Sequence, residues 1–476
     1  MSDVRVAALG AYAPRLRIAA EEFKEAWGTF DASGVETKAV PEADEDALTM
    51  GVEAARRALD QLDRDGSNLA HLAFASTTPP MAEEDLTARL ASMLGAPDDV
   101  TTRTVTGSTR AGAQALDGAL DAGPWGDDIG IVIVGDSPQG APDSATEHAA
   151  GAGAAAVVLD GDGPGAIIDR SSHVEPYPGT RFRPGGGDET TGLGVTEYDR
   201  ESFTTALAGA AEHVEADDID AAAVQSPDGK LPYRATGALG VDAGTISAAE
   251  TVSFLGDTGA ASAFLGTTKA FDEGAERVLL AAYGSGAGAN LFVVDGPVPT
   301  AVALDSDATL SYERYLRRRG EITSDEPEGG GAYVSVPSWQ RTIPQRHRLV
   351  AGRCPSCSAL NFPPSGACHD CNERPDAFEE VELPGTGTVE AATTISQGGA
   401  PPEFVEQQSK SGPFVSAVVA LDGPDGAETV SIPSQVLVGD QTVGIGDRVE
   451  STIRRIYTQE GVTRYGFKAQ LREVRR

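Results

Sequence analysis

Cysteine is nearly absent from this chain of 476 residues, and the four cysteines that occur all lie between residues 354 and 371. Disulfides therefore cannot cross-link the rest of the chain, which excludes a disulfide-rich secreted fold. Long apolar runs are missing as well. No stretch approaches about 18 continuous apolar residues, and the opening MSDVRVAALG lacks the basic and apolar segments of a leader peptide. We expect a cytoplasmic protein without a membrane-spanning helix.

Lysine is scarce, with 6 lysines beside 31 arginines, whereas 72 residues are acidic and the formal net charge is −35. The acidic residues are spread along the whole chain. Such a surface stays hydrated where molar salt screens charges over only about 3 Å, and it repels nucleic acids and anionic lipids. The composition therefore predicts adaptation to high salt and argues against a nucleic-acid or membrane partner. The length predicts about three structural units.

Between residues 4 and 297, short apolar segments alternate with amphipathic ones, which is typical of a layered α/β domain. Two helices are predicted: one at 47–62 after an acidic first turn, and one at 84–95 that ends at Gly95. Buried strands are predicted at 129–137, 154–160, 277–285 and 289–295.

The four predicted strands form two similar pairs. Each pair is joined through a Gly/Ala-rich stretch, AAGAGA at 149–154 in the first and GSGAGA at 284–289 in the second. This weak internal repeat predicts two related halves that meet near residue 165. GSGAGA lacks the Lys-Ser/Thr ending and the spacing of nucleotide-binding loops, which argues against a nucleotide site.

The last third of the chain has a different pattern. A basic helical segment, YERYLRRRG (312–320), precedes an acidic Gly-rich linker, TSDEPEGGG (323–331), so a domain boundary is expected here. From about residue 381, short alternating strands with turn signals and no long helix predict a small β-barrel or sandwich.

All four cysteines belong to two CxxC knuckles, Cys354 with Cys357 and Cys368 with Cys371. Four thiolates at this spacing can close tetrahedrally around Zn²⁺, and a filled ligand shell indicates a structural metal. A redox dithiol pair and an iron–sulfur site are the alternatives, and His369 is predicted to be a bystander. If zinc takes every cysteine, none is left to act as an acyl-carrying nucleophile.

The stretch TVTGSTRAG (104–112) is a small-residue turn between a strand-like and a helix-like segment, where many acyl-transfer enzymes place a nucleophile. It offers only Ser108 and Thr109, and no His or Lys lies close in sequence to activate a hydroxyl. We predict that this pair caps the following helix by accepting hydrogen bonds from free backbone N–H groups. A hydroxyl nucleophile activated by a distant partner and a non-covalent contact to a ligand are the alternatives.

Five segments carry a family resemblance: GAYAPRLRIAAEEFKEAWG, KAVPEADEDALTMGVEAARRAL, EHAAGAGAAAVVL, SPDGKLPYRATGALG and YGSGAGAN. In order and spacing they resemble archaeal-type hydroxymethylglutaryl-CoA synthases over about residues 4–297. The resemblance implies the thiolase fold, with two β/α halves in five layers, and the condensation of acetyl-CoA with acetoacetyl-CoA. Residues from about 310 to 476 resemble a zinc-ribbon and OB-fold family that associates with thiolases and related enzymes.

The positions matched to the family's catalytic residues lack the required side chains. The catalytic Glu is matched by the loop around Thr78, and the Cys by Ser108 or Thr109. Gln225 stands where the family has a His, and Asp257 replaces the Asn of the family's GNT turn. An acyl group needs an activated thiolate, and carbon–carbon bond formation needs a carboxylate that moves protons. The resemblance therefore predicts a catalytically degenerate site.

The resemblance also implies contacts to CoA. Lys230 and Arg234 follow the turn that lies near the CoA tunnel in the family, so they are expected to contact CoA phosphates; the alternative is solvated surface. The further ligand-binding positions expected from the resemblance are Arg110, Gly284 and Gly286.

We therefore predict an α/β thiolase fold with five αβαβα layers, followed by a rubredoxin-like zinc ribbon and a small OB-fold barrel. The predicted function is to bind acyl-CoA and to scaffold or channel it for a thiolase or synthase partner in the mevalonate pathway, as a homodimer with structural Zn²⁺. The alternative is an active enzyme that makes or breaks carbon–carbon bonds in CoA esters without a cysteine.

The predicted domains are the two thiolase-like halves at 1–165 and 166–300, a helical segment and linker at 301–344, the ribbon at 345–380 and the barrel at 381–476.

Overall fold

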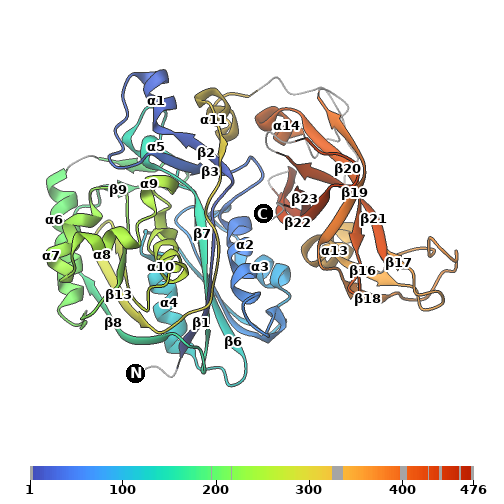
Figure 1. Cartoon of the computed structure of the whole chain (residues 1–476), viewed down its shortest axis with the longest axis horizontal. Helices are drawn as coiled ribbons and strands as arrows, with labels where there is room; N and C mark the ends of the chain where they lie inside the picture. The colour runs from blue at the N-terminus through green and yellow to red at the C-terminus, as the bar shows by residue number, and fades with distance from the viewer. Residues whose placement is uncertain are drawn as a thin grey trace. The chain divides into compact units, whose positions relative to one another are not determined.

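The computed structural model describes residues 4–193, 196–215, 217–323, 336–396, 405–426, 428–438, 442–459 and 462–472. The chain forms two compact units, Met1–Tyr315 and Leu316–Arg476 (Figure 1). The acidic linker expected at 323–331 lies outside the described residues except for Thr323. In the part of the chain that is described, no helix is long and apolar enough to cross a membrane.

A six-stranded sheet forms the first half of the first unit. Its strands β6 and β7 are the apolar runs predicted at 129–137 and 154–160, and every residue in them is buried. Helices α2 (Ala47–Leu59) and α3 (Leu86–Leu94) cover one face of this sheet. The strand order is β14 (Thr300–Ala303), β1 (Arg5–Tyr12), β7 (Gly153–Asp160), β6 (Ile129–Asp136), β4 (Leu69–Ala75) and β5 (Thr101–Val105).

The ends of α2 and α3 follow from their sequences. The Asp46 side chain caps α2, accepting from the backbone N–H groups of Leu48 and Thr49 at 3.0 and 2.9 Å. Gly95 ends α3 in the left-handed conformation, with φ of 75°. Both predicted helices are confirmed, and the first ends three residues earlier than its sequence pattern suggested.

A four-stranded sheet forms the second half of the first unit, and it contains the strands predicted at 277–285 and 289–295. Helices α6 (Thr196–Ala211), α7 (Thr236–Leu239) and α8 (Ala243–Ala248) pack on one of its faces. Phe203 and Leu207 of α6 meet Leu279 and Leu291 of the sheet in a shared apolar cluster. The strand order is β11 (Ala221–Val224), β12 (Arg277–Gly284), β13 (Gly288–Asp295) and β8 (Ala166–Val174).

The two sheets repeat one pairing pattern, which confirms the two related halves expected from the sequence. In the first sheet β4 runs parallel to β6, which is antiparallel to β7, and β7 is antiparallel to β1. In the second sheet β11, β12, β13 and β8 pair in the same way. The first strand of the second half, β8, begins at Ala166.

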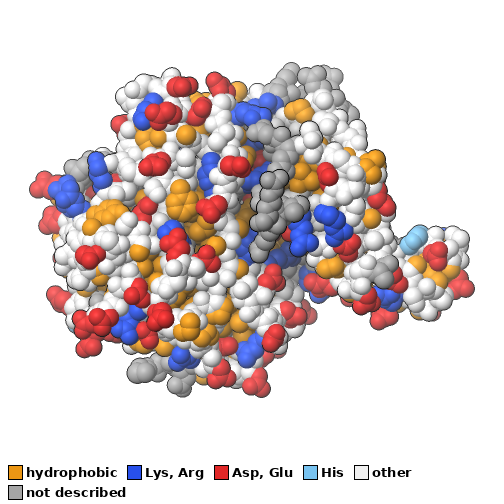
Figure 2. All heavy atoms as spheres, viewed as in Figure 1, with side chains coloured by type: hydrophobic (Ala, Val, Ile, Leu, Met, Phe, Trp, Pro, Cys, Tyr) orange, Lys and Arg blue, Asp and Glu red, His pale blue; other side chains and the backbone are white. Residues whose placement is uncertain are grey.

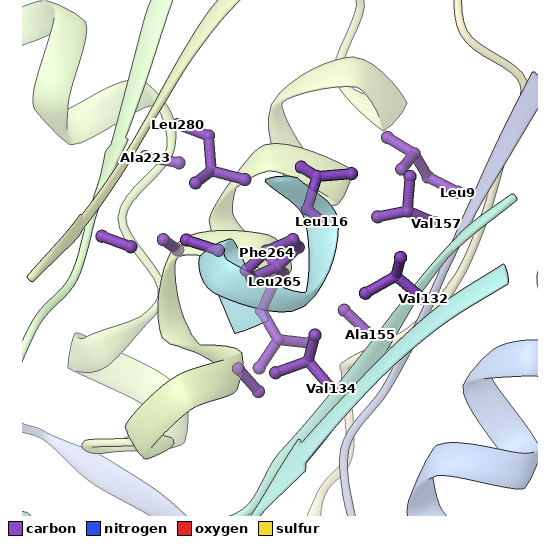
Figure 3. Close-up of a cluster of buried hydrophobic side chains, with 14 of the residues drawn as sticks. Leu9, Leu116, Val132, Val134, Ala155, Val157, Ala223, Phe264, Leu265 and Leu280 are labelled. Atoms are coloured by element: carbon purple, nitrogen blue, oxygen red, sulfur yellow. The ribbon is translucent and has the colours of Figure 1, made fainter. Parts of the chain in front are cut away.

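Helices α4 (Ala111–Ala122) and α10 (Ser262–Asp272) form the layer between the two sheets (Figure 3). Leu116 and Phe264 from these helices lie between Val132 of the first sheet and Leu280 of the second. The core is therefore apolar and continuous from one sheet to the other, which makes its burial the main stabilising term of this unit. The five αβαβα layers predicted from the sequence are confirmed.

Two smaller sheets complete the first unit. The three-stranded sheet has the order β15 (Ala308–Thr309), β2 (Leu16–Ala19) and β3 (Thr37–Val40). The two-stranded sheet pairs β10 (Thr191–Gly192) with β9 (Arg181–Phe182). The remaining short helices are α1 (Ala20–Trp27), α5 (Ala145–Ala149) and α9 (Val252–Leu255), and the basic segment predicted to be helical forms α11 (Tyr312–Arg319).

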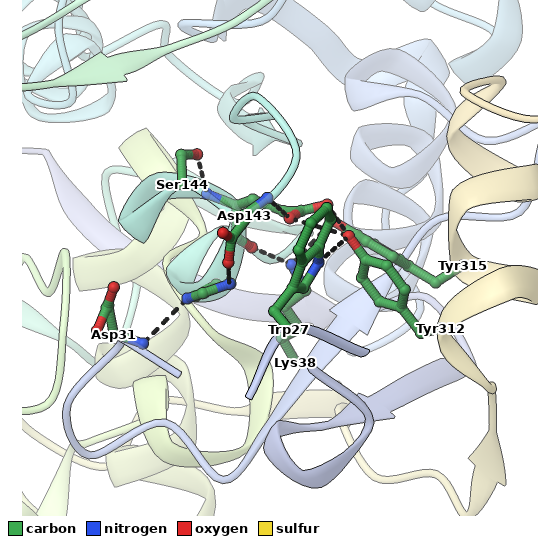
Figure 4. A network of polar contacts seen from close by, with 9 residues as sticks. Trp27, Asp31, Lys38, Asp143, Ser144, Tyr312 and Tyr315 are labelled. Carbon is green, nitrogen blue, oxygen red and sulfur yellow. Dashed lines mark hydrogen bonds and ion pairs between the residues drawn. The ribbon is translucent and has the colours of Figure 1, made fainter. Parts of the chain in front are cut away.

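A buried lysine joins the three-stranded sheet to α5 and α11 (Figure 4). Lys38 of β3 is 1% exposed, and its ammonium group donates to the Glu147 backbone carbonyl and, at 3.0 Å, to the Tyr315 hydroxyl. The ring centroids of Phe23 and Tyr315 lie 4.8 and 4.5 Å from the same nitrogen. Oxygen acceptors and aromatic faces together offset the cost of removing this charge from water.

Glu147 and His148, which open the family-like motif EHAAGAGAAAVVL, belong to the same network. The fully buried Glu147 carboxylate accepts from the backbone N–H of Asp143 at 2.6 Å and from the Tyr312 hydroxyl at 3.3 Å. Burial lowers the pKa of His148, whose Nδ1 accepts from the Asp31 backbone N–H at 3.0 Å, so its ring is neutral. The start of this motif therefore has a structural role.

The second unit contains a small ribbon and a closed barrel. The ribbon strands are β17 (Leu360–Asn361), β16 (Val350–Arg353) and β18 (Glu379–Glu382), preceded by helices α12 (Val336–Arg341) and α13 (Ile343–Arg348). The barrel closes in the order β19 (Thr386–Ile395), β20 (Phe414–Asp422), β21 (Thr429–Leu437), β23 (Val462–Leu471) and β22 (Arg448–Gln459), and the short helix α14 (Val405–Ser411) lies between β19 and β20 in sequence. The predicted small β-barrel is confirmed.

The Lys38 network generates a first prediction. Tyr315→Phe removes the hydroxyl acceptor from a buried ammonium group while it keeps the aromatic face, so unfolding should become easier by about 1.5–3 kcal/mol. Urea unfolding at constant high salt measures this difference. Tyr198→Phe is the matched control, because Tyr198 is 51% exposed, and it should change stability by no more than about 0.5 kcal/mol. Equal stability of the two variants would contradict the assigned role.

Candidate functional site

A buried carboxylate at the end of β6 organises the loops of the candidate site. Asp136 is 0% exposed and is the last residue of the strand. Its two oxygens accept from six donors: Ser76 Oγ at 2.9 Å, Thr77 N and Oγ1 at 2.7 and 2.8 Å, Thr78 N and Oγ1 both at 2.8 Å, and Ala260 N at 2.7 Å. With all of its acceptor capacity engaged, this carboxylate positions two loops and is not available to take a proton from a substrate.

The loop of Asp257 approaches Asp136 so closely that a glycine is required. Gly259 has φ of +55°, and a Cβ added there would lie 2.2 Å from Asp136 Oδ2. The loop around Thr78 and the loop of Asp257, far apart in sequence, are thus held against the same carboxylate.

Asp257 itself forms a buried ion pair. Its side chain is 1% exposed; Oδ2 pairs with the Arg181 guanidinium, and Oδ1 accepts from Gly259 N at 2.9 Å. The neutral Asn expected from the resemblance is therefore replaced here by a charged residue with its own counter-ion. A buried carboxylate would be strongly unfavourable without such a partner.

Segment 180–183, which contains β9, connects three of the site loops. The side chains of Arg181 and Arg183 reach Asp257 and the Thr77 backbone carbonyl. The Ser285 hydroxyl, in the GSGAGA hairpin between β12 and β13, accepts from the Thr180 and Arg181 N–H groups at 3.0 and 3.1 Å. Sequence reasoning missed both arginines.

The turn 107–110 packs against the same hairpin. The Thr109 hydroxyl donates to the Tyr283 carbonyl at 2.6 Å, and a Cβ added to Gly284 would lie 2.5 Å from Ser108 Oγ. The prediction that Ser108 and Thr109 cap α4 is wrong: the N-cap residue is Arg110, and no side chain caps the helix. The hydroxyl of Thr109 instead fixes the turn to β12 through its carbonyl.

Arg110 extends from this turn across the second sheet. Its Nη1 would lie only 1.9 Å from a Cβ added to Gly288, and it donates to the His173 carbonyl at 3.3 Å. Burial lowers the pKa of Arg110, and Asp117 partly opposes that shift. Gly286, which has φ of +121°, accepts from the Tyr177 N–H at 3.0 Å through its carbonyl.

The remaining predicted positions lie further along the second half. Gln225 follows β11, is 3% exposed, and its backbone N–H donates to Ala281 of β12 at 2.9 Å. Lys230 and Arg234 are exposed, and their side chains form no ion pair within the described residues. The predicted positions thus fall into three groups. Asp136 holds the loops of Thr78 and Asp257 together. The turn of Ser108, Thr109 and Arg110 packs against the hairpin that contains Gly284 and Gly286. Lys230 and Arg234 stay on the surface.

The second unit carries the cysteine cluster. The Sγ atoms of Cys354, Cys357, Cys368 and Cys371 all lie within 4.8 Å of one another. Cys354 and Cys371 are 3.7 Å apart and Cys357 and Cys368 are 3.6 Å apart, close to the ~3.8 Å that tetrahedral Zn–S bonds of about 2.3 Å imply. Without a metal the four thiols share their protons unevenly: the backbone N–H of Cys371 lowers the pKa of Cys368 to about 6, whereas burial and the neighbouring thiols raise the pKa of Cys357 to about 12.

A buried amide supports this cluster. Asn361, at the end of β17, donates from Nδ2 to the Ala359 carbonyl at 2.9 Å and to Cys368 Sγ at 3.5 Å. Its Oδ1 accepts from the His369 backbone N–H at 2.9 Å. His369 is not a member of the four-cysteine cluster. Asn361 therefore fixes the second knuckle and stabilises one thiolate, as polar groups around metal ligands commonly do.

The first unit is a thiolase-superfamily lobe, with five αβαβα layers and two halves that share one strand pattern. It is fused to a zinc ribbon, which holds the four cysteines, and to an OB-fold, which is the closed barrel. Family models agree for the second unit. Residues 341–376 match the ChsH2 rubredoxin-like zinc ribbon domain, and residues 380–454 match the ChsH2 C-terminal OB-fold domain.

The lobe is similar to hydroxymethylglutaryl-CoA synthases. The Methanosarcina mazei synthase is 30% identical over 349 residues, covering 67% of this chain and 99% of that protein. The Methanopyrus kandleri synthase is 32% identical over 342 residues, covering 68% and 95%. The chain belongs to the hydroxymethylglutaryl-CoA synthase family.

Solved structures agree on the fold. A structure titled MvaS in complex with 3-hydroxy-3-methylglutaryl coenzyme A superposes with a TM-score of 0.58 at 18% identity, covering 69% of this chain and 94% of that one. A hydroxymethylglutaryl-CoA synthase complexed with CoA gives 0.58 at 16% identity, covering 70% and 94%.

The Asp136 cluster generates a second prediction. Gly259→Ala places a methyl group onto the carboxylate and disfavours the positive φ, so stability should fall by about 2 kcal/mol or more, as measured by urea unfolding. Gly118→Ala in α4 is the control, since its Cβ meets nothing within 4 Å and alanine favours a helix. A Gly259→Ala protein as stable as this control would show that the close approach is not required.

The ribbon generates a third prediction. The purified protein should contain one Zn²⁺ per chain, and Asn361→Ala should weaken zinc binding about 10- to 100-fold, because the thiolate of Cys368 loses a donor. Release of zinc to a chromogenic chelator measures both quantities. Ser365→Ala, an exposed change in the same ribbon, should release zinc like the unmodified chain. Freely titratable thiols in the native protein would contradict the zinc site.

Proposed function

We propose that the first unit binds CoA thioesters without forming an acyl-enzyme. The observation that carries this proposal is that the Thr78 and Thr109 hydroxyl groups, at positions matched to catalytic residues, already have partners. Thr78 Oγ1 donates to Asp136 and accepts from Ser137 N–H, and Thr109 Oγ1 donates to the Tyr283 carbonyl. Neither hydroxyl has a free base to take its proton.

Ser108 is the remaining hydroxyl of the turn, and within the described residues no His or carboxylate hydrogen-bonds to its Oγ. An unassisted serine hydroxyl is a weak nucleophile near neutral pH. Gln225, at the position matched to the family's His, cannot exchange protons in that pH range. The positions matched to the family's Glu, Cys and His therefore all favour binding over covalent catalysis.

The ligand class is supported by charge and by similarity. Three arginines, Arg110, Arg181 and Arg183, gather around the site loops of a chain that has almost twice as many acidic as basic residues. Lys230 and Arg234 add exposed positive charge suited to phosphate groups. Two similar structures are named as complexes with CoA or hydroxymethylglutaryl-CoA, and they support a CoA thioester as ligand.

We further propose that the second unit makes the protein a scaffold for a thiolase or synthase partner in isoprenoid-precursor metabolism. The synthase relatives match only about two thirds of this chain, so the zinc ribbon and barrel are additional to the length of a synthase. We also propose that the protein is a cytoplasmic homodimer adapted to high salt. Acidic side chains are spread over the face seen in Figure 2, which supports the adaptation to salt.

The proposed function gives a fourth prediction. In molar KCl, calorimetry should detect binding of acetyl-CoA and acetoacetyl-CoA, whereas intact mass should show no acetyl adduct. Release of free CoA should stay at background, because the loss of each proton transfer typically lowers a rate about 10²- to 10⁴-fold.

Ser108→Ala and Thr109→Ala are the matched variants, and neither should change the rate of CoA release. An acetyl adduct on either residue, or steady CoA release that a variant abolishes, would favour the alternative of an active enzyme without a catalytic cysteine. Binding too weak to detect for every CoA compound would contradict the ligand.

A further inference from the structure

His71 of β4 is a buried histidine whose ring nitrogens have no partner. Its side chain is 0% exposed, and no described residue hydrogen-bonds to Nδ1 or Nε2. A neutral imidazole has one N–H donor and one acceptor nitrogen, and both would bind water in an unfolded chain. Burying them without partners lowers stability and is rare in folded proteins. This position therefore needs a physical account beyond core packing.

The indole of Trp125 covers this imidazole. The two rings are stacked, with centroids 5.6 Å apart and an angle of 18° between their planes. Gly130 of β6, the register partner of His71, makes room for the indole, because a Cβ added there would collide with it. Trp125 belongs to the segment between α4 and β6 and is only partly buried. The cover that keeps water from His71 thus lies close to the surface.

The charge nearest to this histidine has the wrong sign to stabilise a protonated ring. Side chains alternate along β4, so His71 lies on the same face as Ala73 and Ala75, which pack in the layer of α4. The charged residue of the neighbouring strand β5 is Arg103, opposite Ala73 in the register. Burial lowers the pKa of His71, and Arg103 lowers it further.

The acidic groups of the surrounding elements are engaged elsewhere or exposed. The charged residues in question are Asp117 and Asp121 of α4, which pair with Arg170; Arg89 of α3, on the opposite face, which pairs with Glu84; Asp136 of β6, which accepts from six donors; and the exposed Asp127 and Asp128 after Trp125. The closed structure therefore holds His71 neutral.

A proton can bind His71 only when water reaches the ring. Because its pKa is lowered in the folded state, the opened state binds more protons below the ordinary histidine value of about 6.5. The stability of the closed site is complete above that pH and is lost as the pH falls below it. The edge of the sheet is the easiest place to open, since β5 pairs only with β4 and is largely exposed, whereas every residue of β6 is buried.

We propose that His71 and Trp125 form an acid-sensitive latch, which holds β5 on the edge of the first sheet and opens when His71 takes up a proton from solvent. β5 leads into the turn 107–110, and the Ser76 N–H donates to the Val105 carbonyl at 3.1 Å. Opening of the latch therefore removes support from two segments of the candidate site. The latch does not depend on which ligand that site binds.

Hydrogen exchange of the full chain in molar KCl tests the latch. Mass spectrometry of peptides that cover 69–75 and 101–105 gives the opening constant at each pH, after correction for intrinsic exchange rates. From about pH 7.5 to about pH 5.5, this constant should rise about tenfold more in the unmodified chain than in His71→Leu, because the opened state of the variant has no imidazole to protonate. His71→Phe, which keeps a ring against Trp125, should behave like His71→Leu.

His213→Leu is the matched control, since His213 is exposed, and it should keep the rise seen in the unmodified chain. Equal rises in the unmodified chain and in both His71 variants would overturn the proposal. A rise that is just as large over 277–284 of the second sheet would overturn it as well, because the whole unit rather than the edge of the first sheet would then be opening.

Discussion

The site of this protein depends on the need to satisfy one buried carboxylate. Asp136 ends a strand in which every residue is buried, so its charge is stable only if the surrounding groups replace water. Six donors do so, and they come from the loops that follow β4 and precede α10. The requirement that stabilises the charge also fixes those loops, and through Gly259 it limits how the Asp257 turn can approach.

Other buried charges of the first unit are also stabilised by groups close to them. Asp257 has Arg181, and Lys38 has carbonyl and hydroxyl oxygens with aromatic rings around it. A surface with a large negative charge makes this compensation more important, because every unpaired acid in the interior would add to the repulsion of the whole. The buried positive charges of Lys38 and Arg181 therefore both lie beside groups that stabilise them.

The buried strands, the two halves and the cysteine ribbon could be predicted from the sequence because their signals are local, whereas the five layers were implied by the family resemblance. Buried strands such as 129–136 are continuous apolar runs, and CxxC spacing is read within 18 residues. The organisation of the site could not be predicted in this way. Asp136 meets residues 59 positions before it and 124 after it, and Arg181 meets Asp257 across 76. A lone acid at the end of an apolar strand, and two arginines alternating around Phe182, were the available signals.

The capping role predicted for Ser108 and Thr109 failed for a related reason. A hydroxyl before a helix predicts a cap when only its neighbours in sequence are considered, but the long-range bond from the Thr109 hydroxyl to the Tyr283 carbonyl of β12 orients this side chain, and the N-cap position is Arg110. Hydrogen bonds within the protein also decide whether a group at this site can act as a base. General-base catalysis needs an acceptor that is only partly satisfied before the substrate arrives, whereas the Asp136 carboxylate already accepts from six of the protein's own donors. Asp136 therefore holds the loops of the site in place, and a proton transfer at this site would need a different base.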